Sequence, residues 1–145
     1  MEVTTLWLSP VLGNDEHKTS YHGYANTENY QVDRRFGNNQ LYKKLVDECH
    51  KRGMKMIKDL VHNDIGDQHF LYQDQPAKDW FHQWPTYIGT TYKDQTLFDP
   101  YVAQADKKLM TDGWFDRHML DVNQQNPLVK NTLSKVIFGG LNTLI

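Results

Sequence analysis

The sequence has one cysteine, Cys49, among its 145 residues. A single cysteine excludes an intrachain disulfide and a cysteine-based zinc knuckle. No apolar run approaches the ~20 residues that a membrane-spanning helix needs, and no basic start followed by an apolar stretch marks a signal peptide. The formal net charge is -2, with acidic and basic residues interspersed. We therefore expect no nucleic-acid partner, no polybasic membrane patch and no membrane span.

Aromatic side chains, by contrast, are plentiful. The chain contains 4 Trp, 8 Tyr and 6 Phe, set among many Asp, Asn, Gln and His residues. Flat aromatic faces beside hydrogen-bonding groups suit ring-shaped polar ligands such as sugars, but aromatic residues also fill the cores of small, loop-rich domains. Composition alone favours the second interpretation.

The first half of the chain predicts a strand, a helix and a second strand. Residues 3–8 are β-branched and apolar, and predict a buried strand that ends at Ser9-Pro10. Residues 54–61 predict the second strand. Because one helix and short connections join the two strands, the pattern indicates a βαβ crossover and a parallel sheet.

The helix between these strands is predicted over residues 38–52. Asn38 or Asn39 can cap its start, and Gly53 suits the left-handed position after its end. Its expected apolar stripe consists of Leu41, Leu45, Val46 and Cys49.

The second half of the chain is less regular. Residues 62–126 show no clear periodicity, which in a compact domain is typical of a functional loop or an inserted subdomain. Asn126-Pro127 predicts the start of another helix. Residues 134–145 are expected to form a poor helix, because Gly139-Gly140 lies in their middle.

Polar residues follow the second predicted strand, at the edge where parallel βα units place functional groups. These residues are Asp59, His62, Asn63, Asp64, Asp67 and His69. They could bind a metal or position a hydroxylated ligand, and the metal is the weaker interpretation because no spacing matches a known ligand motif. Hydrogen bonding of Asp59 and Asn63 to loop backbone is the alternative for either residue alone.

The loop after the first strand carries Tyr21-His22-Gly23-Tyr24. Gly23 permits a tight turn that points the two tyrosines in different directions. Either ring could stack on a sugar, although packing is the commoner role of a loop tyrosine. The sequence has no phosphate-binding glycine loop and no nucleophile elbow, and its carboxylates include no pair assignable as acid and nucleophile.

Four segments, in order and spacing, resemble the α-amylase family, glycoside hydrolase family 13. They are residues 4–10 (the family's second barrel strand), residues 21–37 (its next loop), residues 59–63 (its first signature region) and residues 119–123 (a motif near the end of its domain B). The resemblance covers residues 3–131. The tryptophan-rich insertion is most similar to neopullulanase- and cyclomaltodextrinase-like members from bacteria.

The resemblance implies an α/β fold, namely a partial (β/α)₈ TIM barrel of strand, helix and strand with an irregular domain B-like insertion. Residues 1–64 would form the barrel portion, residues 65–126 the insertion, and residues 127–145 the start of the next barrel helix. The implied partner is a maltooligosaccharide or a cyclodextrin-like α-glucan. A bacterial enzyme of the periplasm or the cytoplasm is expected, and the sequence does not choose between these compartments.

The resemblance also implies roles for individual residues. Tyr24 would stack against the sugar ring at the cleavage subsite, and His22 would line the same subsite. Asn63 would support the junction with domain B, where some members bind calcium; no other cofactor is expected. Asp59 would be a supporting carboxylate behind the sugar. Asp64 replaces a histidine that helps to hold the sugar, and so brings the opposite charge from imidazolium to the substrate site.

The family uses a retaining mechanism with a carboxylate nucleophile and a separate acid/base. These residues belong to the fourth and fifth barrel strands, and a further aspartate to the seventh. The chain ends before the fourth strand, so we expect it to be inactive alone. Two other interpretations stay open: a non-catalytic maltooligosaccharide-binding remnant, and a structural fragment that needs the remainder of the barrel from another chain. A frameshift near residues 132–134 is a further hypothesis, because codons exist for which a shifted frame encodes a family-like continuation.

Overall fold

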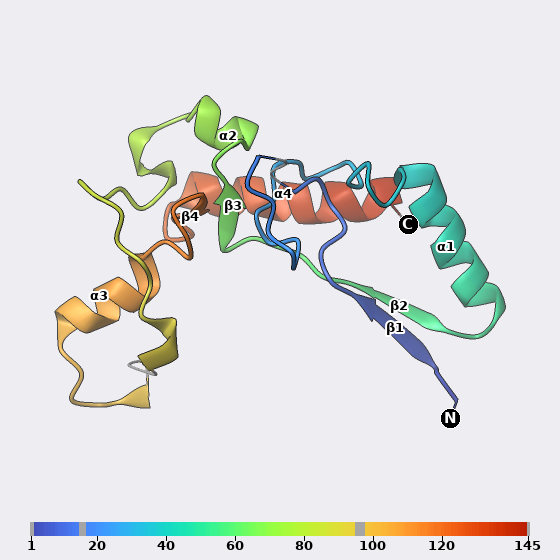
Figure 1. Cartoon of the computed structure of the whole chain (residues 1–145), viewed down its shortest axis with the longest axis horizontal. Coiled ribbons are helices and arrows are strands. Elements are labelled where there is room, and N and C mark those ends of the chain that lie inside the picture. Colours follow the sequence, from blue (N-terminus) through green and yellow to red (C-terminus); the bar gives the residue numbers. More distant parts are fainter. Residues whose placement is uncertain (1, 15–16, 95–97, 145) are drawn as a thin grey trace.

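The computed structural model describes residues 2–14, 17–94 and 98–144. Its elements, in chain order, are β1 (Thr5–Leu8), α1 (Asn39–Lys51), β2 (Lys55–Lys58), β3 (Asp64–Gly66), α2 (Phe70–Gln73), α3 (Gln104–Asp112), β4 (Met119–Asp121) and α4 (Pro127–Leu144). Short 3-10 helices occur at Lys78–Trp80 and Tyr92–Asp94. The molecule is elongated: β1, β2 and α1 lie at one end, α2 and α3 lie at the other, and α4 runs between them (Figure 1).

The predicted βαβ unit is confirmed. Strands β1 and β2 pair in parallel, with Trp7 opposite Ile57. Both strands are shorter than predicted, and the expected burial of β1 is wrong. Trp7 is 70% exposed and Ile57 is 45% exposed, because the sheet that holds them has only two strands among the described residues. Trp7 and Ile57 therefore lie side by side on a face of the sheet that is open to solvent.

Helix α1 has the predicted limits. The Asn38 side chain caps it by accepting a hydrogen bond from the Leu41 amide, and Gly53 follows with φ +71. The predicted stripe is partly wrong, because Leu41 and Leu45 are exposed. The buried positions are Tyr42, Val46 and Cys49. The buried face of α1 therefore includes Tyr42 in place of the neighbouring Leu41, and it packs against Leu12 and Val32.

The segment without clear periodicity contains several short elements. Its two ends meet in an antiparallel pair, β3 with β4, in which Asp64 lies opposite Asp121. A second core surrounds this pair, separate from the one under α1, and consists of Ile65, Trp80, Phe81, Leu120, Val122 and Val129. Among the described residues the sheets are β1–β2 and β3–β4 only, and neither of them closes into a barrel.

Helix α4 begins at Pro127, as predicted, and the Asn126 side chain accepts a hydrogen bond from the Leu128 amide. The expectation of a poor helix after residue 134 is wrong, since α4 continues through Gly139-Gly140 to Leu144. Two glycines cost a helix about 2 kcal/mol relative to alanine, which neighbouring turns and packing can offset. One such contact joins α4 to α1. No helix in the described part of the chain is long and apolar enough to cross a membrane.

Candidate functional site

Two cavities lie on either side of the Tyr21–Tyr24 loop. The first, of about 510 Å³, opens between β1, α1 and this loop, and we name it the β1–α1 pocket. The second, of about 590 Å³, is lined by the loop after β2, the β3–β4 pair and the end of α3, and we name it the acidic pocket. His22 lines the first cavity, whereas Tyr24, Asn63 and Asp64 line the second.

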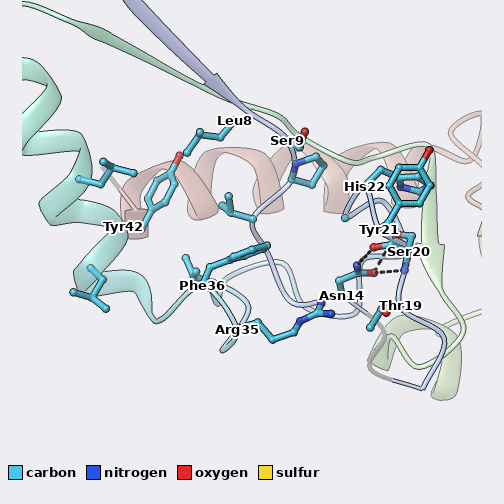
Figure 2. Close-up of a pocket in the computed structure, with 16 residues that line it drawn as sticks. Leu8, Ser9, Asn14, Thr19, Ser20, Tyr21, His22, Arg35, Phe36 and Tyr42 are labelled. Carbon is cyan, nitrogen blue, oxygen red and sulfur yellow. Dashed lines mark hydrogen bonds between the residues drawn. The ribbon is translucent and has the colours of Figure 1, made fainter.

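The β1–α1 pocket has an apolar floor. Leu8, Phe36 and Tyr42 converge on it from β1, the following loop and α1 (Figure 2). On its polar side Asn14 and Ser20 bond to each other: the Ser20 hydroxyl donates to Asn14 Oδ1 at 3.2 Å. A lining of this kind is more typical of a surface that packs against other side chains than of a sugar-binding site.

Tyr24 is held from two sides. Its hydroxyl donates to Asp59 Oδ2 at 3.0 Å, and its backbone amide donates to His22 Nδ1 at 3.2 Å. The hydrogen bond to Asp59 and then burial raise the pKa of the Tyr24 hydroxyl. Burial and nearby His118 lower the pKa of His22, which is consistent with a neutral ring that accepts at Nδ1. The structure thus brings together three of the residues predicted for the site.

Asp64 lies in the wall of the acidic pocket beside Asp121. It is 7% exposed, and its Oδ2 has no hydrogen-bond partner within the described part of the chain. Burial and the charge of Asp121 raise the pKa of Asp64 to about 7. The neighbouring Asn63 donates from Nδ2 to Asp121 Oδ1 at 3.2 Å, so the loop after β2 and strand β4 share one polar cluster.

A histidine that the sequence analysis did not identify completes this cluster. His82 Nδ1 lies 2.5 Å from Asp121 Oδ2, and His82 Nε2 lies 3.8 Å from Asp112 Oδ1. The hydrogen bond to Asp121 raises the pKa of His82, and burial opposes that effect. Asp112 is also bonded to Lys108. Nothing in the sequence links His82 with residues 30 and 39 positions away, so only the fold reveals the arrangement.

Aromatic rings also line the acidic pocket. Tyr92 and Phe115 stack with their ring centroids 5.2 Å apart and their planes at 22°. Together with Tyr24 they place three rings around the cavity that contains the carboxylates. Aromatic faces beside hydrogen-bonding groups can bind the apolar face and the hydroxyl groups of a sugar ring.

In the described part of the chain, the side-chain oxygens of Asn63 and Asp121 are engaged in hydrogen bonds. Asn63 Oδ1 accepts a hydrogen bond from Gln124 at 3.1 Å, and both oxygens of Asp121 are bonded to side chains. Calcium needs six to eight oxygen ligands. Among residues 2–14, 17–94 and 98–144, no group of three or more His, Cys, Asp or Glu side chains could hold a metal ion. Asn63 as a calcium ligand stays a prediction.

Known proteins resemble this chain over nearly its whole length. The family "Alpha amylase, catalytic domain" matches residues 1–140, which extends the expected resemblance over residues 3–131 by two residues at the start and nine at the end. Cyclomaltodextrinase of Thermoanaerobacter pseudethanolicus is 35% identical over 132 residues, which are 83% of this chain and 22% of that protein. Neopullulanase 2 of Thermoactinomyces vulgaris is 36% identical over 86 residues, which are 54% of this chain and 14% of that protein.

A solved structure shows the same likeness in three dimensions. The α-amylase of Geobacillus thermoleovorans, solved with acarbose, superimposes with a TM-score of 0.74 at 33% identity, over 97% of this chain and 28% of that one. The chain therefore spans less than a third of the length of these relatives. The family match, the barrel-type neighbours and the four motifs agree: the chain belongs to the α-amylase family and is similar to neopullulanases and cyclomaltodextrinases.

Proposed function

We propose that this chain provides the sugar-binding part of an α-amylase-type glycoside hydrolase site, with a maltooligosaccharide or a cyclodextrin-like α-glucan as ligand. The observation that carries the proposal is the acidic pocket. Its volume of about 590 Å³ lies within the range of small-ligand sites, and aromatic rings and hydrogen-bonding side chains line it together. Relatives named neopullulanase, cyclomaltodextrinase and oligo-1,6-glucosidase support an α-glucan as the ligand class.

Tyr24 is the residue to which we assign the sugar contact. Its hydroxyl is bonded to Asp59, which holds the ring in a fixed orientation, and the side chain lines the cavity. Asp59 acts through Tyr24 in this proposal and does not contact the sugar. His22 supports the same loop through the Tyr24 amide.

We do not expect the chain to hydrolyse the glucan on its own. Retaining hydrolysis needs one carboxylate that attacks and another that protonates the leaving group, on either side of the scissile bond. Asp64 and Asp121 are neighbours across one strand pair and so occupy one wall, and both oxygens of Asp121 are bonded to Asn63 and His82. This geometry favours binding of the glucan over its hydrolysis.

Calorimetry with maltoheptaose and a reducing-sugar assay on the purified chain test the two statements separately. We expect heat of binding at millimolar sugar and no turnover of maltoheptaose or cyclodextrin. Tyr24→Ala should weaken binding about tenfold or more, because the loss of an aromatic contact costs about 1–3 kcal/mol. Tyr21→Ala is the matched control, since Tyr21 is fully exposed and does not line the acidic pocket. An equal loss of affinity in both variants, or no heat of binding to the wild-type chain, would refute the sugar site. Turnover of maltoheptaose or cyclodextrin would refute the expected inactivity.

The open face of β1–β2 favours a second role, that of a structural piece completed by the remainder of a barrel on another chain. Trp7 and Ile57 lie side by side on this face, and an exposed apolar strand pair is an association site. Mixing the chain with the later part of a cyclomaltodextrinase barrel should shift Trp7 fluorescence to shorter wavelength, and Trp7→Phe should abolish that shift. An unchanged spectrum for the wild-type chain would contradict this role.

A further inference from the structure

The acidic pocket is more negative than a site for a neutral sugar requires. Asp64, Asp112 and Asp121 all line it, and the described lining includes no Lys or Arg. Asp112 is paired with Lys108, and Asp121 is paired with His82. For the third carboxylate, Asp64, the described residues provide no partner for Oδ2.

The position of Asp64 is imposed by the fold. Strand β3 places it opposite Asp121, and β3 is buried along its whole length. A side chain that is 7% exposed, with an unbonded oxygen, is costly unless something else satisfies it, because a buried carboxylate without a partner loses its hydration. Since Asp64 also lines the cavity, a ligand in the acidic pocket is well placed to supply that partner.

We propose that the acidic pocket selects an α-glucan that carries an ammonium group over the neutral sugar of the same length, and that Asp64 is the residue that recognises the ammonium. The inference rests on the proposed α-glucan site and specifies its ligand. A sugar hydroxyl donates one hydrogen bond and brings no charge. An ammonium donates up to three hydrogen bonds and offsets the repulsion between Asp64 and Asp121.

The aromatic lining acts in the same direction. Tyr24, Tyr92 and Phe115 line the cavity, and a cation within about 6 Å of a ring centroid is attracted to the face of that ring. His82 does not neutralise Asp64, because it lies between Asp112 and Asp121 and is bonded to Asp121. The net field in the cavity therefore favours a positive ligand.

The test compares maltotriose with maltotriose analogues that carry an amine at C2, C3 or C6 of the non-reducing ring. Calorimetry on the purified chain at pH 7.5 should show at least one analogue bound about tenfold more tightly than maltotriose, the gain typical of a charge-assisted hydrogen bond. In Asp64→Asn the ratio of the two affinities should fall to within twofold of one. Asp64→His, which restores the residue usual in the family, should reverse the ratio.

Asp106→Asn is the matched control. Asp106 lies exposed on α3 and does not line the pocket, so the same change of charge there should leave the ratio unaltered. Thermal denaturation of each variant checks that it is folded. If maltotriose binds and no analogue binds more tightly, the inference is wrong while the proposed function stands. If no sugar binds, both fail. A preference that survives in Asp64→Asn assigns recognition to another group and overturns the role of Asp64.

Discussion

Lys58 should destabilise this fold at neutral pH. It ends strand β2, where its half-buried side chain places Nζ out of contact with solvent, and the described residues offer that atom no hydrogen-bond partner. Burial lowers the pKa of Lys58 from 10.5 to about 8. One pKa unit corresponds to about 1.4 kcal/mol, so the full depression is worth about 3 kcal/mol. Because the side chain is only half-buried, solvent screening reduces this to about 1–2 kcal/mol.

The sign of the pH dependence follows from proton binding. Between pH 8 and 10.5 the unfolded chain keeps its proton on Lys58 while the folded chain loses it, so the free energy of unfolding rises with pH in this window. Lys58→Met removes the charge and keeps a similar length. We expect this variant to be more stable than wild type by about 1–2 kcal/mol at pH 7, with the difference shrinking toward zero by pH 10.

Urea denaturation at pH 7, 8, 9 and 10, followed by tryptophan fluorescence, measures this difference. Lys55→Met is the matched control, because Lys55 lies on the same strand with its side chain exposed. The comparison of variant with wild type at each pH cancels the titration of other groups. A Lys58→Met variant that is less stable than wild type at pH 7, or a difference that stays constant up to pH 10, would refute the reasoning.

Three further outcomes are expected. Hydrogen bonds from Arg35 lower the pKa of Asp33 to about 2, so the stability that ionised Asp33 contributes should be complete above about pH 4 and lost as the pH falls toward 2. Asp33→Asn should remove this pH dependence and lower the free energy of unfolding by about 2 kcal/mol, measured by urea denaturation at pH 7. Phe81→Ala should cost about 3–5 kcal/mol in the same assay, because Phe81 is fully buried, whereas Phe98→Ala at an exposed position should cost less than about 0.5 kcal/mol. Chelation of calcium should change Tm by less than about 1 °C, because the Asn63 and Asp121 oxygens already have protein partners; a larger fall on adding EDTA would show that calcium binds the folded chain.

Local chemistry made the first half of the fold predictable. Asn38 caps α1 with its own side chain, and Gly53 ends the helix with a positive φ, so two residues determine the helix limits without tertiary contacts. The crossover between two apolar segments then requires a parallel pair. The stripe of α1 was less predictable, because Leu41 and Tyr42 are both apolar and only the position of Leu12 and Val32 decides which of them is buried.

The tail and the insertion were harder to predict, for different reasons. Glycine propensity argues against a helix at residues 139–140, yet α4 continues because helix formation is cooperative once begun and α1 lies against it. The insertion depends on long-range pairing of β3 with β4, which leaves no short periodic signal in a segment of aromatic and polar residues.

The sequence by itself determined the family, the helix that joins β1 to β2, and the residues Tyr24, Asp59, Asn63 and Asp64 as candidates for a site. Only the tertiary structure decided how these residues act together. In the folded chain the Tyr24 hydroxyl is bonded to Asp59, and His22 lines the β1–α1 pocket. Asp64 lies opposite Asp121, which is bonded to His82. The physical reason is distance along the chain. Motifs record short-range spacing, whereas charge, burial and the pKa of Asp64 depend on a neighbour 57 positions away that only β3–β4 pairing brings into contact.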